Sequence, residues 1–598
     1  MKNRQTWSYG LFACLCLYAL LSLPASSLLA QTTLTYYNQS FKIDTLYPAT
    51  GSTGMTSPWE IVYGPDDSLW VTASHDYKIW KIHPGNKGAR VLLDMNGMKD
   101  FTAATANPWP QGGLMGLAIH PQFYSGKPWV YVAFVYHLIG CSTCAGSTSG
   151  ARCSYNTQIV RFKYSNGILT PMDTVITGLD GSNDHNSGRL RISPQPESDG
   201  KYHLYYSIGD MGAGQLANIC RAEHAQDTTV IEGKILRLNT EPDATQPAGP
   251  QEWIPADNPF PAGGAASAKT PIYSFGHRNP QGLAFGSVDG GSSYLLYSVE
   301  HGDKSDDEVN IIDPHTNYGW PKVAGLCDDN YTSTLNDSLY LAGQAVISET
   351  GFCDTTPTTL AEPIFSYYNW TRAQNDYIAR TYPSANMNWP TVAPTSVAFY
   401  GQSAVPGWNY SLLITSLKNG LWRLKLKSDG LSVDSTVNPY DTLHYLPGYR
   451  LRDITVAPTG DTLFVAVDNS CCTLGVTGTI GNSVASPDLG FILRMVYLTP
   501  LALDSVYKTP PQPAATQQPA ALIYPNPAHG FLNVTAGQGQ RKPILIQLYS
   551  SGGDLVQTQQ TWEDQTTLNI QSCQPGVYIL RLTNGAAVPM LTQKVLIE

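Results

Sequence analysis

Residues 273–321 hold side chains whose types and spacing suit the binding of an anion and of a hard cation. Arg278 lies in a polar segment between two apolar runs, keeps its charge at any usable pH, and offers a planar fork of donors for carboxylates or quinone-like oxygens. Asp306, Asp307 and Glu308 lie in an acidic, Gly-containing loop after the next apolar run, and oxygen-rich loops suit calcium. A polar loop with a buried structural ion pair is the alternative interpretation.

Other polar side chains also stand at the ends of apolar runs. His185 follows Asp184, and an imidazole that titrates near neutral pH beside an orienting carboxylate can act as a general base; a purely structural histidine is the alternative. Arg450 and Arg452 are two residues apart, so an extended segment places both on one face. The remaining residues of this kind are Gln111, Asp210, Gln215 and Lys418.

A strand–turn–strand pattern that recurs six times would position these residues. Its first strands begin at Ile61, Leu117, Leu190, Leu283, Val397 and Ile454. A shorter strand follows each pair, near Ile79, Ile159, Ile235, Val309, Leu421 and Ile492. Six small antiparallel sheets predict an all-β fold, a six-bladed propeller over residues 40–500 that is complete at Val496 and Tyr497; two β-sandwiches are the alternative. A propeller would gather the loops of one end around a central mouth.

The charges narrow the class of ligand. Arg278, Lys418, Arg450 and Arg452 would repel one another at a shared mouth, which predicts an anionic ligand such as a polycarboxylate or a phosphate. The chain holds no nucleophile elbow, zincin helix, P-loop or dinucleotide fingerprint, which argues against the common hydrolases and against nicotinamide enzymes. A formal net charge of −10 without a Lys/Arg-rich tract argues against a nucleic-acid partner.

The first thirty residues predict an exported protein. Lys2 and Arg4 precede an apolar run and then small residues, which is the pattern of a secretory signal peptide over residues 1–30, and no other segment is apolar enough to span a membrane. Nine of the eleven cysteines would remain after cleavage, and in an exported chain disulfides are favoured over metal or redox sites. We therefore expect a stapled loop at Cys141, Cys144 and Cys153. A further pair, Cys327 with Cys353, is compatible with the sequence, although spacing alone does not fix the connectivity.

The chain is too long for one ordinary hydrophobic core, and its amino-acid composition changes near residue 500. Residues 504–520 are a Pro/Gln-rich linker, and residues 521–598 predict a small β-sandwich-like domain. The motifs YPNPAHGFLNV, GVYILRL and KVLIE in this domain resemble the C-terminal sorting domain of the type-nine secretion system. The resemblance implies contact with the secretion machinery, passage through the periplasm and a secreted or cell-surface location. A sandwich that binds carbohydrate or protein is the alternative.

Residues from about Ser57 to Tyr497 resemble a second family. The motifs are DHNSGRL, IGDMGAGQL, FGHRNPQGLAF, SDDEVN, NYGWPKVAG, NWPTVAP, SLKNG and YRLRD, in this order. They are similar to those of the soluble PQQ-dependent glucose dehydrogenases (glucose/sorbosone dehydrogenases). The resemblance implies a six-bladed propeller that binds PQQ and calcium, oxidises an aldose at its anomeric carbon to the lactone, and passes the electrons to an external acceptor.

The resemblance also implies a role for individual residues. His185 would be the general base, and Arg278 would lie beside the quinone carbonyl that accepts hydride. PQQ would be held by Arg278 together with Gln111, Asn279, Thr391, Lys418, Arg450 and Arg452. Asp210, Gln215 and Trp389 would line the sugar side. Calcium at the cofactor would take backbone carbonyls of Gly302 and Asp303, and a structural calcium would take Glu308, Tyr318, Asp328 and Glu349.

The chain departs from the family pattern at several places. Asp303 stands where the family usually has proline, and Asn386 and Asn388 stand where it has an aromatic residue and a cysteine. The insertion from Cys141 to Cys153 is foreign to the pattern. A calcium-dependent propeller lactonase and a non-catalytic sugar-binding surface protein are the alternative functions, and the sequence leaves a homodimer open.

Overall fold

A computed structural model describes most of residues 32–499 and 521–597, and it divides the chain into two compact units, Met1–Pro500 and Leu501–Glu598. Within those ranges it leaves out residues 38, 49–53, 148–149, 263–267, 331–347, 357–359, 370, 374–389, 419, 436–442, 448, 469–488, 525–527, 537–542, 551–554, 564 and 584–588. The predicted signal peptide and linker lie outside the described residues and stay predictions.

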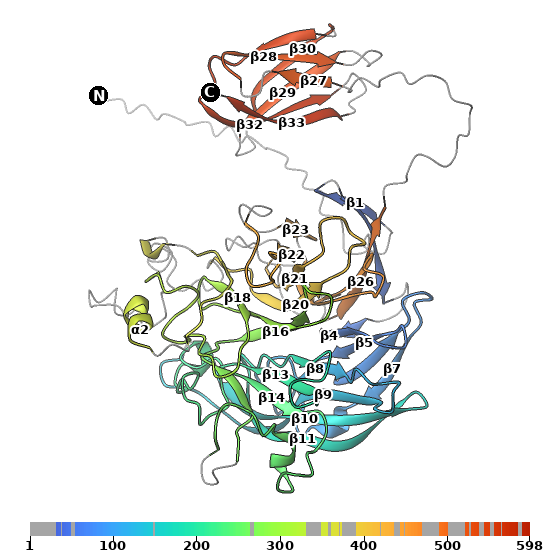
Figure 1. Ribbon diagram of the computed structural model, residues 1–598, viewed down its shortest axis with the longest axis vertical. Coiled ribbons are helices and arrows are strands. Elements are labelled where there is room, and N and C mark those ends of the chain that lie inside the picture. Colours follow the sequence, from blue (N-terminus) through green and yellow to red (C-terminus); the bar gives the residue numbers. More distant parts are fainter. Residues whose placement is uncertain are drawn as a thin grey trace, which may run out of the picture. The chain divides into compact units, whose positions relative to one another are not determined.

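The described part of the first unit holds six antiparallel sheets (Figure 1). The first contains β4 (Pro58–Tyr63), β5 (Leu69–Ala73), β6 (Lys78–Ile82) and β7 (Ala89–Asp94). The second contains β8 (Leu114–Ile119), β9 (Trp129–Ser142), β10 (Arg152–Ser165) and β11 (Ile168–Ser182). The third contains β12 (Leu190–Ile192), β13 (His203–Ile208), β14 (Lys234–Asn239) and β15 (Ile272–Phe275).

The remaining three sheets repeat this order. The fourth contains β16 (Pro280–Gly286), β17 (Leu295–Glu300), β18 (Asp307–Ile311) and β19 (Phe365–Tyr367). The fifth contains β20 (Pro394–Tyr400), β21 (Ser411–Ser416), β22 (Gly420–Lys425) and β23 (Leu443–Tyr445). The sixth contains β24 (Leu451–Val456), β25 (Thr462–Val467), β26 (Leu489–Leu498), β2 (Gln39–Tyr47) and β1 (Thr32–Tyr36), and β3 (Met55–Thr56) pairs with β26.

The six sheets form a closed ring. Each innermost strand contacts the innermost strand of the next sheet, in the order β4, β8, β12, β16, β20 and β24, and β24 contacts β4 again. Hydrophobic side chains fill the space between consecutive sheets, as Trp70 and Phe134 do between the first two and Tyr297 and Leu412 do between the fourth and fifth. The ring confirms the six-bladed propeller and excludes two separate sandwiches.

The sixth blade contains strands that the sequence repeats did not predict. Its last strand in chain order, β26, ends at Leu498 close to the expected Val496 and Tyr497, but strand β2 from the N-terminal end pairs with it and places Lys42 and Phe41 opposite those residues. An exposed β26 would leave a row of unpaired backbone groups, and β2 satisfies them. Sequence repeats do not reveal such pairing, since the two strands lie more than four hundred residues apart.

Few helices interrupt the described chain. They are α2 (Glu349–Thr355) and the short 3₁₀ segments η2 (Asn96–Met98), η3 (Leu216–Asn218) and η4 (Pro250–Trp253). No helix among the described residues has the length and apolar character needed to cross a membrane. Disulfides join Cys141 to Cys153, Cys144 to Cys220 and Cys327 to Cys353, which confirms the stapled loop and the Cys327–Cys353 pair.

The second unit consists of two antiparallel sheets. One contains β27 (Ala521–Tyr524), β28 (Phe531–Ala536) and β31 (Gln565–Asn569). The other contains β29 (Ile544–Ser550), β30 (Leu555–Thr561), β32 (Gly576–Thr583) and β33 (Pro589–Ile597). Buried Val534, Ile546 and Leu580 belong to the core between them, as the alternating pattern of these strands requires. The predicted sandwich-like C-terminal domain is therefore confirmed.

Candidate active site

The predicted site residues gather at one end of the propeller, where the innermost strands begin. Gln111, His185, Arg278, Thr391 and Arg450 all lie in segments that lead into an innermost strand. The second strand of an antiparallel blade ends where the first begins, so the loops after β13, β17 and β21 reach the same end. Those loops carry Asp210, Gln215, Gly302, Asp303 and Lys418.

His185 has the geometry of an oriented base. Its buried ring places Nδ1 2.6 Å from Asp210 Oδ1, and Trp320 Nε1 donates to the other Asp210 oxygen at 2.9 Å. With Nδ1 donating to Asp210, Nε2 is the acceptor, and it lies 2.9 Å from Gln215 Nε2. The expected orienting carboxylate is wrong: Asp184 Oδ1 is 3.8 Å from Nε2. The sequence signal that could have identified Asp210 as the partner of His185 is the apolar strand β13, which ends just before Gly209 and Asp210.

Arg278 lies beside this base. Its guanidinium donates to Gln215 Oε1 at 2.7 Å, faces Asp303 Oδ1 at 3.3 Å and stacks 5.2 Å from the Trp320 ring. Gln215 therefore contacts both the base and the cation. Asp184 holds the Gln215 amide in turn, with an oxygen 3.0 Å from Gln215 Nε2.

Glu300 was missed by the sequence reasoning. One of its oxygens accepts the backbone N–H groups of Arg278 and Asn279, and the other lies 2.9 Å from His277 Nδ1. Burial raises the pKa of Glu300 to about 8, while burial lowers the pKa of His277 to about 3. A glutamate at the end of an apolar strand, followed by His301 and Gly302, was the signal that could have found it.

Carboxylates lie near all four predicted cations, so the expectation that these cations repel one another is wrong. Arg450 and Arg452 both face Asp468, and Arg278 faces Asp303. Burial lowers the pKa of the Lys418 ammonium, and the charge of Asp307 opposes that shift. Self-repulsion therefore does not require an anionic ligand. Nearby carboxylates lie after strands β25 and β17, where sequence spacing does not reveal their partners.

The end of the propeller still offers donors to an acidic ligand. Asn279 Nδ2 is buried and has no hydrogen-bond partner among the described atoms, although its Oδ1 accepts from Ser187 and Gln281. Burial, with the charges of Arg278, His185 and Arg452, holds the pKa of His301 well below its usual range. These interactions bring groups from the third, fourth and sixth blades together.

The remaining predicted cofactor contacts lie on the same side. Gln111 Oε1 accepts the backbone N–H of Asn186 at 2.9 Å, one residue after His185. Thr391 is half-buried, and the two residues that follow it donate their N–H groups to Asp307. Trp389, Asn386 and Asn388 lie outside the described residues, so the predicted sugar-side tryptophan stays a prediction.

The predicted metal ligands are brought together only in part. A Cβ on Gly302 would lie 1.9 Å from the Ser305 carbonyl, so the tight loop requires glycine. Buried Glu308 and Glu349 accept the N–H groups of Gly325 and Ala324. Asp328 is exposed, and the Tyr318 hydroxyl donates to a backbone carbonyl. Within the described ranges no three His, Cys, Asp or Glu side chains form a metal-binding group.

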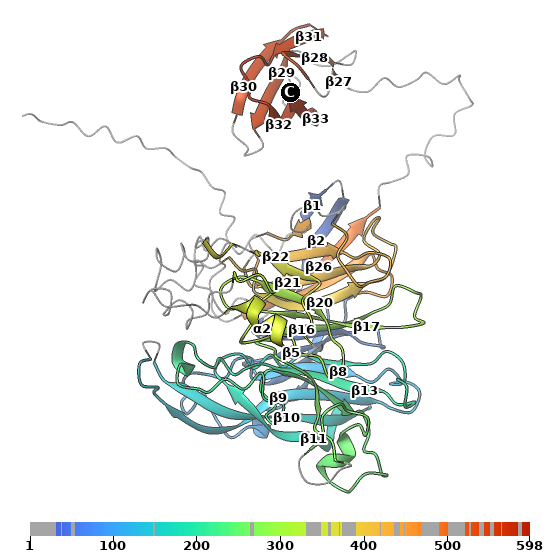
Figure 2. The ribbon, with the colours of Figure 1, turned by 60° about the vertical axis from the view of Figure 1, so that its left-hand side comes forward.

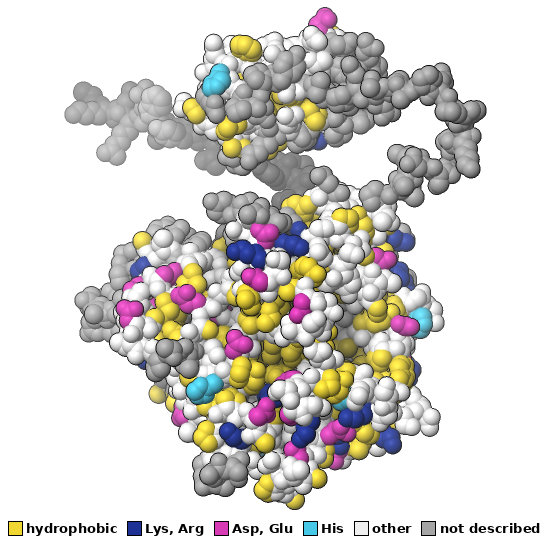
Figure 3. Space-filling view, in the orientation of Figure 1, with side chains coloured by type: hydrophobic (Ala, Val, Ile, Leu, Met, Phe, Trp, Pro, Cys, Tyr) yellow, Lys and Arg dark blue, Asp and Glu magenta, His cyan; other side chains and the backbone are white. Residues whose placement is uncertain are grey.

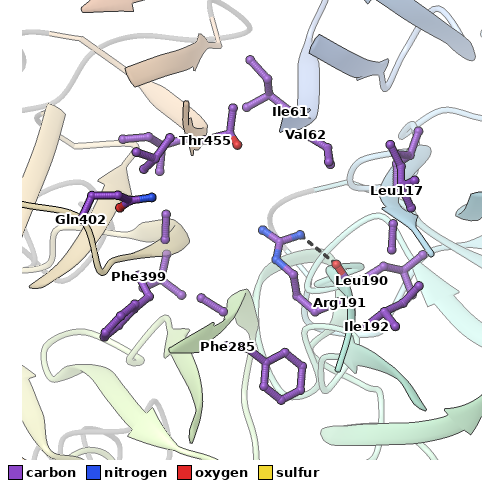
Figure 4. Close-up of a pocket in the computed structure, with 17 residues that line it drawn as sticks. Ile61, Val62, Leu117, Leu190, Arg191, Ile192, Phe285, Phe399, Gln402 and Thr455 are labelled. Carbon is purple, nitrogen blue, oxygen red and sulfur yellow. Dashed lines mark hydrogen bonds between the residues drawn. The ribbon is translucent and has the colours of Figure 1, made fainter. Parts of the chain in front are cut away.

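The opposite end of the central channel has a different character. A cavity of about 360 Å³ is lined by the last residues of the innermost strands, among them Ile61, Leu117 and Phe285. Arg191 points into it and donates to the Leu190 carbonyl (Figure 4). Hydrophobic side chains gather around the hollow of this face in the space-filling view (Figure 3). Deeper in the channel, Arg189 Nη1 lies 2.6 Å from Glu60 Oε2 and 3.1 Å from Asp453 Oδ2.

The fold is a six-bladed propeller, and at one end of it a buried histidine held by a carboxylate lies close to an arginine. The family model for glucose/sorbosone dehydrogenase matches residues 55–340 and 366–475. The chain therefore belongs to the glucose/sorbosone dehydrogenase family and is a sugar dehydrogenase. Residues 522–598 match the secretion system C-terminal sorting domain, so the chain also carries a sorting domain for type-nine secretion.

The chain is similar to several named proteins. Quinoprotein glucose dehydrogenase B of Acinetobacter calcoaceticus is 30% identical over 476 residues, which are 74% of this chain and 89% of the relative. Aldose sugar dehydrogenase YliI of Escherichia coli is 25% identical over 419 residues, 69% of this chain and 87% of the relative. The PQQ-bound aldose sugar dehydrogenase structure from Streptomyces coelicolor shares 24% identity, with a TM-score of 0.46, over 77% of this chain and 98% of that one.

Proposed function

We propose that this protein is a PQQ-dependent aldose dehydrogenase that oxidises a glucose-like sugar at its anomeric carbon to the lactone. The observation that supports the proposal is the chain of contacts Asp210–His185–Gln215–Arg278: the Gln215 amide contacts both the imidazole that Asp210 holds and the Arg278 guanidinium. The oxidation removes a proton from the anomeric hydroxyl and a hydride from the anomeric carbon. His185 is suited to accept the proton, and Arg278 is suited to stabilise the negative charge that develops on the hydride acceptor.

The protein's own residues would divide the work as follows. His185 takes the proton of the anomeric hydroxyl at Nε2, because Nδ1 is held by Asp210 and the resulting imidazolium gains that carboxylate as a partner. Arg278 presents positive charge where negative charge develops on the hydride acceptor. Gln215 and Asp184 offer hydrogen bonds to sugar hydroxyls. PQQ, when bound, supplies the two-electron acceptor, and an external acceptor reoxidises it.

The donor set fits such a cofactor. The Nδ2 group of Asn279, which has no partner among the described atoms, supplies a donor, and Lys418, Arg450 and Arg452 supply charge-assisted contacts for an acidic ligand. Gln111 and Thr391 complete the predicted set of cofactor contacts. Backbone carbonyls of Gly302 and Asp303 would take a calcium ion at the cofactor. Glu308, Tyr318, Asp328 and Glu349 are the proposed ligands of a structural calcium ion, which would also lower the cost of keeping the buried Glu308 carboxylate ionised.

The test is reconstitution of purified protein with PQQ and calcium, followed by reduction of a redox dye with a panel of aldoses. We expect dye reduction with at least one aldose, dependent on added PQQ, and one lactone formed per two-electron equivalent. Samples without PQQ or without calcium are the controls. Turnover of a lactone without any aldose oxidation would instead assign a propeller lactonase, and sugar binding without turnover would assign a non-catalytic binding protein.

The C-terminal domain supports a location for this activity. We propose that the sorting domain directs the enzyme through the outer membrane by the type-nine machinery, after passage through the periplasm, so that sugar oxidation takes place at the cell surface or outside the cell. The match of residues 522–598 to the sorting-domain family supports this proposal.

A further inference from the structure

Strands β9 and β10 form a long hairpin that reaches the end of the propeller where the site residues lie. Strands β9 and β10 pair up to their tip, where Cys141 is bonded to Cys153 (Figure 2). A second disulfide leaves this hairpin: buried Cys144 is bonded to exposed Cys220, 76 residues further along the chain. Cys220 lies two residues after η3, which begins directly after Gln215.

The hairpin thereby contacts both loops that form the base and its surroundings. The Cys144–Cys220 bond holds the end of the loop that carries Asp210 and Gln215. The backbone N–H of Cys153 donates to Asn183 Oδ1 at 3.0 Å, two residues before His185. The two loops also press on each other, because a Cβ on Gly212 would lie 2.9 Å from Asp184 Cβ.

Both loops hold residues in a conformation that side chains disfavour. His185 and Ser187 have φ angles of 53° and 55°, and Met211 and Leu216 have φ angles of 62° and 45°. Each such residue costs on the order of 1 kcal/mol or more and persists only where the surroundings impose it. In the loop with Met211 and Leu216, the Cys144–Cys220 bond is a covalent constraint that a hydrogen bond cannot replace.

We propose that Cys144 and Cys220 are positioning residues for sugar recognition: their disulfide keeps Gln215 between His185 and Arg278. This inference rests on the proposed function. Without the bond, the loop after Asp210 relaxes toward favoured φ angles, Gln215 leaves its two contacts, and the sugar loses a preorganised hydrogen-bonding partner. The cofactor contacts from the fourth, fifth and sixth blades stay in place, so PQQ binding is unaffected.

The test compares two disulfide deletions in the full chain loaded with PQQ and calcium. In Cys144→Ser/Cys220→Ser we expect KM for the aldose to rise about tenfold, the size of one lost hydrogen bond, with kcat changed less than about threefold. The matched control is Cys141→Ser/Cys153→Ser, which removes a disulfide from the same hairpin but leaves the bond to Cys220; its KM stays within about twofold of the parent value. PQQ titration should give the same affinity in all three proteins.

A merely structural role gives a different result. It would lower the fraction of protein that binds PQQ, while the KM of the enzyme that still binds PQQ stays unchanged. That outcome overturns the proposal. An unchanged KM in fully loaded enzyme overturns it as well. If the double variant does not fold, mild reduction of the folded parent, followed by mass-spectrometric detection of a labelled Cys220, must raise KM in the same way. The control variant must keep this response to the reductant.

The proposed function can fail independently. If the parent protein oxidises no aldose, the function is wrong, and amide hydrogen exchange then tests the positioning role without activity. Faster exchange over residues 209–220 in Cys144→Ser/Cys220→Ser than in Cys141→Ser/Cys153→Ser supports the role, and equal exchange overturns it.

Discussion

The propeller and the C-terminal domain bury different kinds of side chain. The propeller encloses charged groups such as Glu60, Arg189, Asp210 and Glu300, whereas every buried side chain of the C-terminal domain within the described residues is hydrophobic, as Ile546 is. Burying a charge costs free energy unless it is paired, so a domain that only has to fold gains nothing from it. From this contrast we expect the chemistry to be confined to the propeller.

The same contrast recurs within the propeller itself. The first residues of the innermost strands and the loops beside them carry His185, Arg278 and Lys418, while the last residues of the same strands line the cavity with side chains such as Ile61 and Phe285. One set of strands thus presents a polar end and an apolar end. The predictions below test whether activity follows the buried charges.

The largest effect is expected at the base. His185→Asn should lower kcat by about two to four orders of magnitude, the usual contribution of a positioned general base, because the amide cannot accept the proton at the place of Nε2. PQQ should remain bound, since the proposed cofactor contacts lie on other residues. Single-turnover rates of the PQQ-loaded variant measure the change. Near-normal turnover would rule out His185 as the base.

Cofactor affinity should respond to a buried cation at the same end. Lys418→Ala should weaken PQQ binding about ten- to hundredfold because a charge-assisted contact is lost, with kcat retained at saturating PQQ. Lys427→Ala, an exposed lysine of the same blade, is the matched control and should bind PQQ like the parent. Equal affinities in fluorescence titrations of the two variants would contradict the assignment of Lys418.

Stability of the two units should depend differently on acid. Burial, with the charge of Lys127 as a smaller cause, lowers the pKa of His120 in the propeller to about 4. Below pH 6.5 the unfolded chain binds a proton there that the folded chain does not, so stability is present above pH 6.5 and is lost as pH falls toward 4. His120→Asn should remove about 2 kcal/mol of this loss between pH 6.5 and 4.5.

Denaturant unfolding of the two proteins at pH 4.5, 5.5 and 6.5 measures this difference. The transition of the C-terminal domain should change little over the range, because its described residues include no buried histidine. An equal slope with pH in the parent and in His120→Asn would show that other groups control acid unfolding.

The strands were predictable from sequence because their apolar runs and turns are local signals: each third strand, such as the one at Ile235, lies where the pattern indicates. The sites of His185 and Arg278 followed from their places at strand ends. Their partners did not, since Asp210 meets His185 and Glu300 meets the backbone of Arg278 only through the ring and the blade pairing. The same holds for Asp468, the partner of Arg450 and Arg452. The closing strand β2 was missed for the same reason.

The smallest effect is expected from removing the C-terminal domain. A chain that ends at Leu503 keeps all six blades, including strand β2 that closes the sixth, and all predicted catalytic, cofactor and metal residues. Expressed in a conventional host, it should fold, bind PQQ and keep the specific activity of the full chain within about twofold, because the described residues of the removed domain include no buried polar side chain. The matched control is the full-length chain with Gln571→Ala, a change of an exposed residue in the C-terminal domain. It should keep both the specific activity and the export of the parent.

In the native cell the two proteins should differ in location rather than in rate. The full chain should reach the cell surface or the medium, while the shortened chain should remain as active enzyme in the periplasm, since it lacks the sorting domain. Fractionation with the dye assay measures both. Loss of specific activity in the purified shortened chain would assign a structural or catalytic role to the C-terminal domain, and the confinement of chemistry to the propeller would then be wrong.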